Sequence, residues 1–428
     1  MPVSARTPGW LTPRKRERPG TSRFTGSRRE PEAPLLVGEP TSRTPEGTRA
    51  PALSPLEFVS GVAVGGQPDV TPLPDPVPGR TARQALEAVI AGHLRREPCV
   101  VSFSGGRDSS AVLAVAATVA RREGLALPVP VTFRFPDVAL SNESDWQERI
   151  IRHLRLEHWE RMDLTSELDL LGDIARHCLT THGLAWPPNA YLHVPVFRAA
   201  RSGTVLTGLD GDGLFGDWRW CHAQAVLHRQ VPAHWRDVAR VGLAFAPALV
   251  RQLVLRRQPP YLPDWLSSSA RHDLETALLD RAASEPRRWD RRVQWHARSR
   301  ALWLAMRNLD LMGSVDEVDV AHPLLAPEFL AALAAEGSAG GFGDRTSAMR
   351  HLVGDLLPDD LVERRTKAVF GGAVWRERAL DFARRWDGTG FDPEVVEAER
   401  LQAAWMAEHP VFHSWTLLQA AWLAGQEK

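Results

Sequence analysis

The residues best suited to chemistry in this chain form a short glycine-rich loop, Ser104–Ser109 (SGGRDS). The loop lies between an apolar segment of strand length and a segment with helical periodicity. Gly105 and Gly106 allow the backbone to approach a ligand, and the following helix N-terminus presents N–H groups without intrahelical partners. Two serine hydroxyls add donors. The loop is therefore suited to phosphate, although it is neither a GK[ST] loop nor a GxGxxG fingerprint.

Asp108 lies in the first turn of that helix, where a carboxylate would repel phosphate unless it held a cation. A second glycine-rich loop, Thr207–Gly216 (TGLDGDGLFG), follows another apolar segment and carries Asp212. Mg²⁺ prefers carboxylate and phosphate oxygens together. We expect Asp108 and Asp212 to share Mg²⁺ across a bound triphosphate. The simpler alternatives are a tight turn with a helix cap at Asp108 and Ser109 for the first loop, and a plain turn or a calcium-like Asp/Gly loop for the second.

The elements around these loops alternate between strands and helices. Apolar runs predict strands at residues 99–104, 129–135, 158–164 and 203–210, and amphipathic periodicity predicts helices at 82–96, 108–124 and 145–156. This alternation predicts an α/β fold with a doubly wound parallel sheet, in which ligands bind at the carboxyl ends of the strands. After about Trp218 we predict no strand, and the C-terminal region reads as mostly helical.

The chain divides into three regions by composition. Residues 1–80 are rich in Pro, Gly, Ser, Thr and Arg and are predicted to be a largely disordered tail and linker. Within them, a basic tail that docks on a partner and an apolar piece at 56–64 that packs on the next domain are alternatives. Residues 81–218 are predicted to form an α/β nucleotide-binding core, and residues 219–428 a helical region that completes the site.

Bulk properties limit the partners and the location. Lys plus Arg and Asp plus Glu both number 52, so no nucleic-acid partner is expected. Neither an apolar run of membrane-spanning length nor a secretory signal is found, so a cytoplasmic protein without membrane contact is expected. Cys99, Cys178 and Cys221 form no CxxC pair and read as free thiols. Tyr191 is expected to pack, with the substrate pocket as its alternative position.

Four segments, in order, resemble one known family. SFSGGRDSS is similar to the pyrophosphate-binding loop of PP-loop ATP pyrophosphatases, and LTGLDGDGLFGDW to the SGEGSDELFGGY loop of asparagine synthetases and β-lactam synthetases. VDEVDVAHPLL is similar to the family's VEARVPFLD segment. MRHLVGDLLPDDLVERRTKAVFGG is similar to its LRxALxxLLPxxxxxRxKxGF segment. The resemblance runs from about Ala82 to about Trp375 and implies a Rossmann-like PP-loop fold.

The resemblance also implies a reaction. ATP would be cleaved to AMP and pyrophosphate while a carboxylate becomes an acyl-adenylate that an amine attacks. The residues implied to bind pyrophosphate, magnesium or the nucleotide are Ser104, Gly105, Gly106, Asp108, Ser109, Thr207, Gly208 and Asp212, with Phe103 and Phe135 on the adenine side. Lys367 falls on the family's catalytic lysine. Only two other lysines, Lys15 and Lys428, occur in this arginine-rich chain, so an ammonium at that position is a specific choice.

Some positions depart from the family's pattern. Leu209 and Gly213 stand where the family has glutamates, so the proton acceptor would be Asp210 or an acidic group from the second half. That group consists of Asp316, Glu317 and Asp319. Ala321 and Ala326 replace an Arg and an Asp, so aspartate is not assured as the substrate.

The nitrogen source is open as well. The chain begins Met-Pro without the N-terminal cysteine of a glutaminase domain, so this resemblance does not supply ammonia from glutamine. The amine would come from free ammonia, a separate amidotransferase or biosynthetic partner, or the substrate itself. The expected function is an amide-forming, ATP-dependent ligase. The alternatives are a PP-loop enzyme that activates another oxygen and a catalytically degenerate nucleotide-binding partner in a biosynthetic complex.

Overall fold

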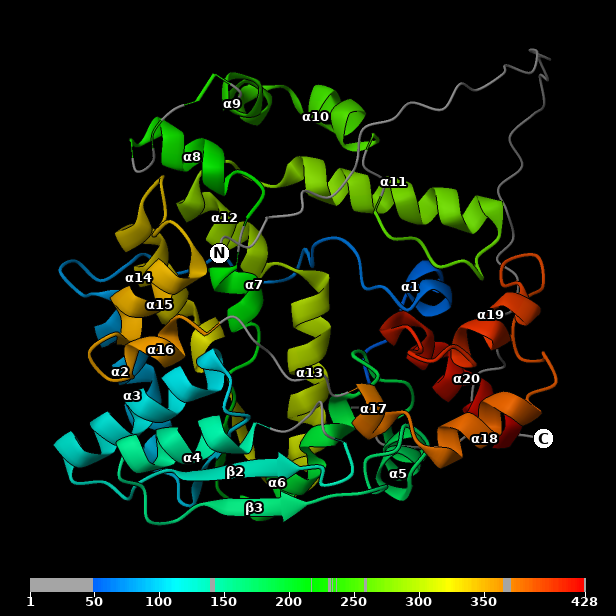
Figure 1. The fold of residues 1–428 in the computed structure, drawn as a ribbon, viewed down its shortest axis with the longest axis horizontal. Helices are drawn as coiled ribbons and strands as arrows, with labels where there is room; N and C mark the ends of the chain where they lie inside the picture. The colour runs from blue at the N-terminus through cyan, green and yellow to red at the C-terminus, as the bar shows by residue number, and fades with distance from the viewer. Residues whose placement is uncertain are drawn as a thin grey trace, which may run out of the picture. The chain divides into compact units, whose positions relative to one another are not determined.

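The α/β part of the chain is built on a five-stranded parallel sheet, two strands of which, β2 and β3, are labelled in Figure 1. The computed structural model describes residues 49–138, 143–216, 218–229, 232, 234–235, 237–257, 260–364 and 371–426. The strand order is β3-β2-β1-β4-β5, and every neighbouring pair is parallel. The strands are β1 (Cys99–Ser102), β2 (Val129–Arg134), β3 (Glu160–Asp163), β4 (Thr204–Leu206) and β5 (Asp319–Ala321). The predicted α/β parallel sheet is thus confirmed.

The two central strands are apolar because both faces of the sheet are covered. Val101 and Leu206 belong to one buried core, together with side chains of α2 (Ala82–Leu94) and α3 (Arg107–Glu123). Val100 and Val205, from the same strands, belong to a second core on the other face. Neighbouring residues of a strand point to opposite faces, so continuous apolar runs supply both cores.

The fifth strand corrects the expectation of no strand after Trp218. Asp319–Ala321 pairs with β4 in the register Thr204↔Asp319 and Leu206↔Ala321. Three residues beginning with an aspartate carry too little apolar pattern to be recognised alone. The segment becomes a strand because β4 offers it a row of backbone hydrogen-bond partners.

The rest of the chain is helical, as predicted, and several helices continue the two cores. Trp289 of α12 and Phe329 of α14 join the core of α2 and α3, and Trp405 and Trp415 join the core on the opposite face. The described residues belong to one compact unit. The remaining elements are α4 (Ser144–His153), α5 (Asp173–His182), η2 (Ala190–His193), α6 (Val194–Ala199), α7 (Gly211–Phe215), α8 (Cys221–Leu227), α9 (Asp237–Phe245), α10 (Ala248–Leu255), α11 (Ser268–Ser284), α12 (Trp289–Ala297), α13 (Arg300–Ser314), η3 (Pro323–Leu325), α14 (Pro327–Gly337), α15 (Arg345–Val353), α16 (Asp359–Val362), α17 (Gly371–Val374), α18 (Glu377–Arg385), α19 (Ala398–Trp405), η4 (Phe412–Ser414) and α20 (Trp415–Gln426).

Ordered structure begins before the expected boundary near residue 80. Helix α1 (Pro55–Ser60) starts with a capping box between Ser54 and Glu57 and buries Val59. The buried Glu57 carboxylate accepts a hydrogen bond from Arg300 Nε at 3.2 Å. The expectation of disorder is therefore wrong for this stretch, and the alternative that the apolar piece packs on the following domain is confirmed. Residues 1–48 lie outside the described part of the chain.

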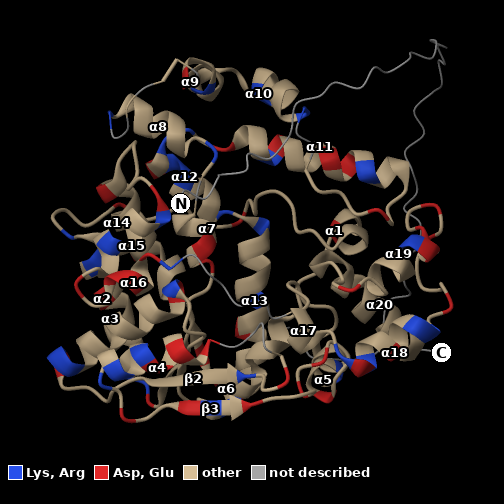
Figure 2. Ribbon diagram, in the orientation of Figure 1, with Lys and Arg blue, Asp and Glu red and all other residues tan. Residues whose placement is uncertain are grey.

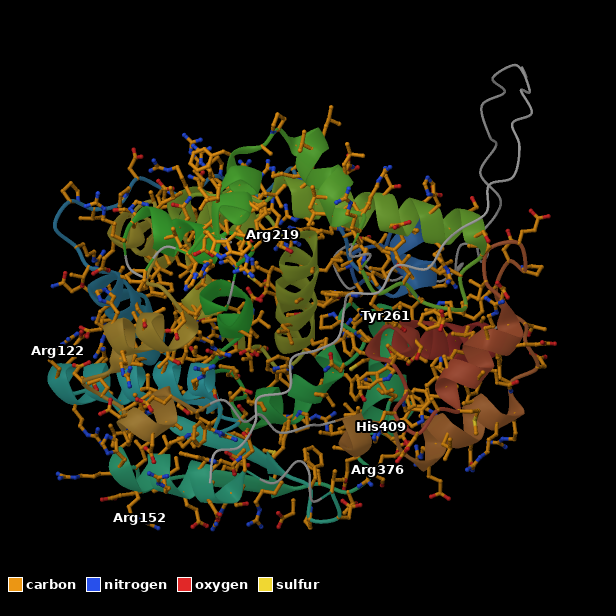
Figure 3. The ribbon with its side chains drawn as sticks, turned by 45° about the horizontal axis from the view of Figure 1, so that its top comes forward. Arg122, Arg152, Arg219, Tyr261, Arg376 and His409 are labelled. Carbon is orange, nitrogen blue, oxygen red and sulfur yellow. The ribbon has the colours of Figure 1, made fainter. Side chains whose placement is uncertain are left out.

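Charges of both signs share the same helices, for example α11 and α18 (Figure 2). Figure 3 shows Arg122 of α3 and Arg152 of α4 at the periphery, where both side chains are exposed. None of the helices within the described ranges is long and apolar enough to cross a membrane.

Candidate active site

A cavity of about 550 Å³ lies where the two glycine-rich loops leave β1 and β4. It is lined by Ser102, Ser104, Gly106, Arg107, Asp108, Ser109, Glu143, His193, Thr207, Gly208, Leu209, Asp210, Asp212, Arg345 and Arg364. Eight of these residues were predicted from the sequence as site residues. Because β1 and β4 are paired in parallel, their carboxyl ends bring the two loops together, as sharing of one ion by Asp108 and Asp212 would require.

The first loop turns sharply and directs its polar groups into this cavity. Gly105 adopts φ +83, and a Cβ there would lie 2.7 Å from Gln147 Cγ, so the position favours glycine on two counts. The Ser104 and Ser109 hydroxyl oxygens are 3.1 Å apart. Helix α3 begins without a side-chain cap. Its first N–H groups and the two hydroxyls form a donor set suited to phosphate oxygens.

The second loop packs against the first through glycine. A Cβ on Gly208 would lie 2.6 Å from the backbone nitrogen of Ser109, and one on Gly211 would collide with the Asp108 carboxyl group. These contacts explain why the second loop is glycine-rich. Its backbone must come within van der Waals distance of the first loop.

We expect the Gly208→Ala variant to bind ATP at least about tenfold more weakly, a loss of about 1.4 kcal/mol, because the added methyl group displaces the first loop. Calorimetric titration with ATP measures the change. Gly242→Ala is the matched control, since a Cβ at Gly242 meets no atom within 4 Å. Equal ATP affinity in both variants would show that the loop contact does not set the phosphate site.

In this structure, the two aspartates predicted to share Mg²⁺ both contact the guanidinium group of Arg345. Arg345 Nη2 donates to Asp108 Oδ1 and Oδ2 at 2.8 and 2.7 Å, and Arg345 Nη1 forms an ion pair with Asp212 Oδ1. The side chains of Asp108 and Asp212 are 15% and 44% exposed, respectively. Sequence reasoning missed Arg345, because nothing local to α15 marks it as a partner of loops more than a hundred residues away.

These two carboxylates fit Mg²⁺. Among the described residues, no group of three or more His, Cys, Asp or Glu side chains gathers as metal ligands. A donor set of two carboxylates, with the other positions left to phosphate oxygens and water, is how Mg²⁺ is usually held beside a nucleotide. The point where Arg345 now balances both charges is where such an ion would be attracted.

A buried ion pair on the cavity wall supports the first loop. Arg364 Nη1 donates to the carbonyl oxygen of Gly105 at 3.0 Å, and Nη2 forms an ion pair with Glu143. The side chains of Arg364 and Glu143 are only 6% and 4% exposed, and the Arg364 guanidinium lies 4.9 Å from the Trp146 ring centroid. Sequence analysis assigned Arg364 no role. The only signal for it was its place in the segment that resembles the family's RxK motif.

A neutral histidine holds the start of the second loop. His322 Nδ1 and Thr207 Oγ1 are 2.7 Å apart. Burial, with a smaller contribution from the nearby His193, lowers the pKa of His322 to about 3. Because an ordinary histidine titrates near pH 6.5, His322 binds a proton below about that pH in the unfolded chain but stays neutral in the folded chain.

That difference makes the stability depend on pH. The contribution of the neutral His322 to the free energy of unfolding is fully present above about pH 6.5 and is lost as the pH falls toward the pKa that His322 has in the folded chain. Between about pH 7.5 and about pH 5.5 the loss is about 1.4 kcal/mol. We expect the His322→Asn variant to lack this part of the decline, as measured by urea unfolding at both pH values. His272→Asn, at an exposed position on α11, should decline as the wild type does. An unchanged slope in His322→Asn would contradict the neutral, buried imidazole.

Three predicted residues stand apart from the cavity lining. Phe103 and Phe135 are 2% and 7% exposed and pack in the two cores, and Gly105 supports the loop without lining the cavity. Lys367 lies outside the described residues.

The alternative acidic group lies away from the cavity. Asp319 begins β5, at the amino end of the strands, and its carboxylate is 2.8 Å from His93 Nδ1. Asp316 and Glu317 precede it, and none of the three lines the cavity. Asp210 does line it. The placement therefore favours Asp210 over this group as a proton acceptor.

Two further expectations concern buried residues. Tyr191 is 2% exposed and donates to the carbonyl oxygen of Leu168 at 2.9 Å, so its packing role is confirmed. Cys99 and Cys178 are buried free thiols, and the half-buried Cys221 donates from Sγ to the carbonyl oxygen of Gly343 at 3.1 Å. Burial raises the pKa of Cys99 to about 12 and that of Cys178 to about 11, which makes both thiols poor nucleophiles.

The parallel sheet and the two loops at its carboxyl edge define a doubly wound α/β protein of the nucleotide-binding type. The family model described as asparagine synthase matches residues 81–424. The chain therefore belongs to the asparagine synthase family, whose members are ATP-using, amide-forming ligases. A search of curated proteins finds no match.

Proposed function

We propose that this chain adenylates a substrate carboxylate with ATP and transfers the acyl group to an amine. The observation that carries the proposal is that Asp108 and Asp212 both contact the Arg345 guanidinium, beside the hydroxyls of the first loop and the N-terminus of α3. A triphosphate needs hydrogen-bond donors and a divalent cation at the same place, and this cavity offers the donors together with two carboxylates that would hold the cation.

In the first step, a substrate carboxylate oxygen bonds to the α-phosphorus of ATP, and the bond to the bridging oxygen of the β-phosphate breaks. Ser104, Ser109 and the first N–H groups of α3 hold the departing pyrophosphate. Asp108 and Asp212 would hold Mg²⁺, which neutralises the developing charge. Arg345 lies where its guanidinium can turn from the two carboxylates to the phosphate oxygens.

In the second step, the amine nitrogen bonds to the acyl carbon, the carbon–oxygen bond to AMP breaks, and the leaving phosphate keeps the electron pair. The nitrogen must lose a proton, and Asp210 is the carboxylate on the cavity wall that would accept it. Lys367 would stabilise the charge that builds up in the transition state. The nitrogen comes from ammonia, a separate amidotransferase or an amine of the substrate.

The test is pyrophosphate release with ATP and Mg²⁺ across a panel of carboxylates that includes aspartate. We expect release that depends on a carboxylate in the wild type and its loss in both Lys367→Ala and Lys367→Arg, because a guanidinium does not replace a compact ammonium. Lys428→Ala is the control. ATP binding without release under every carboxylate would refute the ligase and favour a nucleotide-binding partner.

A further inference from the structure

The backbone of Asp210 has an unusual conformation. Its φ is +61, in the left-handed region that non-glycine residues seldom occupy. Asp210 Oδ2 lies 2.5 Å from His296 Nε2, and the two side chains are 19% and 14% exposed. His296 comes from α12, more than eighty positions along the chain. Such a backbone conformation persists only where the surroundings enforce it, and this contact with His296 is part of those surroundings.

Gly213 provides the room for this contact. A Cβ at position 213 would collide with Asp210 Oδ1 and lie 3.0 Å from His296 Cε1. The backbone there has little freedom to yield, because the buried Arg292 donates to the carbonyl oxygens of Gly213 and Leu214 at 2.8 and 2.9 Å. A glutamate at this position, as in the family's motif, is incompatible with the Asp210–His296 pair as it stands. The Asp210–His296 pair, as it stands, therefore depends on glycine at position 213.

We propose that His296 is a positioning residue that holds the Asp210 carboxylate at the cavity wall to receive the attacking amine, and that Gly213 makes this arrangement possible. The inference rests on the proposed function and deepens its second step. When the carbon–nitrogen bond forms, one proton passes from nitrogen to Asp210 Oδ1 while His296 keeps its hydrogen bond to Oδ2. AMP leaves with the electron pair of the broken carbon–oxygen bond.

This role separates the two half-reactions, because the pair has no part in adenylation. The test uses a carboxylate that supports pyrophosphate release by the wild type. Two reactions are followed in each variant, namely the exchange of labelled pyrophosphate into ATP and the formation of amide with ammonium chloride. Hydroxylamine is then offered as a second nucleophile, because it is uncharged at neutral pH and depends less on a proton acceptor.

We expect His296→Leu and Gly213→Ala to keep exchange within about twofold of the wild type and to lose about 100-fold in amide formation. His296→Gln, whose amide N–H can still donate to Asp210, should recover part of that loss. Hydroxamate formation with hydroxylamine should fall far less than amide formation. The controls are His272→Leu, exposed on α11, and Gly242→Ala, where a Cβ meets nothing within 4 Å.

The outcomes discriminate between the two proposals. If exchange and amide formation fall together in His296→Leu, the pair is a structural support of the whole cavity and the inference is wrong. Unchanged amide formation in His296→Leu overturns it as well. If the wild type shows no exchange with any carboxylate, the proposed adenylation itself fails, and the positioning role is refuted with it.

Discussion

Carboxylate-dependent pyrophosphate release should fall about a thousandfold in the Asp108→Asn variant. Asparagine keeps the size of the side chain, which matters because Gly211 packs directly on the Asp108 carboxyl group. The substitution removes one of the two negative charges that now contact Arg345 and that would hold Mg²⁺. Mg²⁺ would then bind one carboxylate instead of two, and the charge on the departing pyrophosphate would be less well neutralised.

The measurement is the initial rate of pyrophosphate release at saturating ATP over a range of Mg²⁺ concentrations. Asp163→Asn is the matched control, because Asp163 pairs with Arg134 in an exposed salt bridge at the end of β3. That variant should release pyrophosphate at the wild-type rate. If Asp108→Asn retained wild-type turnover at low Mg²⁺ concentration, Asp108 would not be a metal ligand.

The largest effect on stability is expected from Arg364→Met. The substitution leaves the Glu143 carboxylate, 4% exposed, without its guanidinium partner and removes the donor to the Gly105 carbonyl oxygen. Breaking a buried ion pair from one side costs about 3–5 kcal/mol. We expect the free energy of unfolding, measured by urea titration, to fall by that amount. Phosphate binding should weaken as well, because Gly105 belongs to the first loop.

Two comparisons make this result specific. The double variant Arg364→Met, Glu143→Leu should recover much of the stability, because it removes the buried charge as well as its partner. Arg134→Ala, which breaks an exposed pair, should leave the free energy of unfolding nearly unchanged. A loss below about 1 kcal/mol in Arg364→Met would mean that Glu143 finds other partners or water.

A strand could be recognised from the sequence where its own residues carry the apolar pattern. β1 and β4 are apolar because both of their faces are buried, and that shows in the residues themselves. β5 has only three residues, and its pairing with β4 defines it. Helix α1 was missed for another reason, because its local signal, the capping box of Ser54 and Glu57, stands in a stretch of linker-like composition. Its Glu57 is stabilised by Arg300, more than 240 positions away.

For the site, the sequence by itself determined the two glycine-rich loops, their place after buried strands and the aspartates that they carry. Glycine where backbones meet and carboxylates beside phosphate donors are requirements that a short segment expresses alone. Only the tertiary structure decided which side chains meet those loops. Arg345 reaches Asp108 and Asp212, Arg364 supports Gly105, and His296 holds Asp210. Arg345 and His296 lie on distant helices, and Arg364 follows the end of α16. The role of each follows from where packing places it, which no local pattern records.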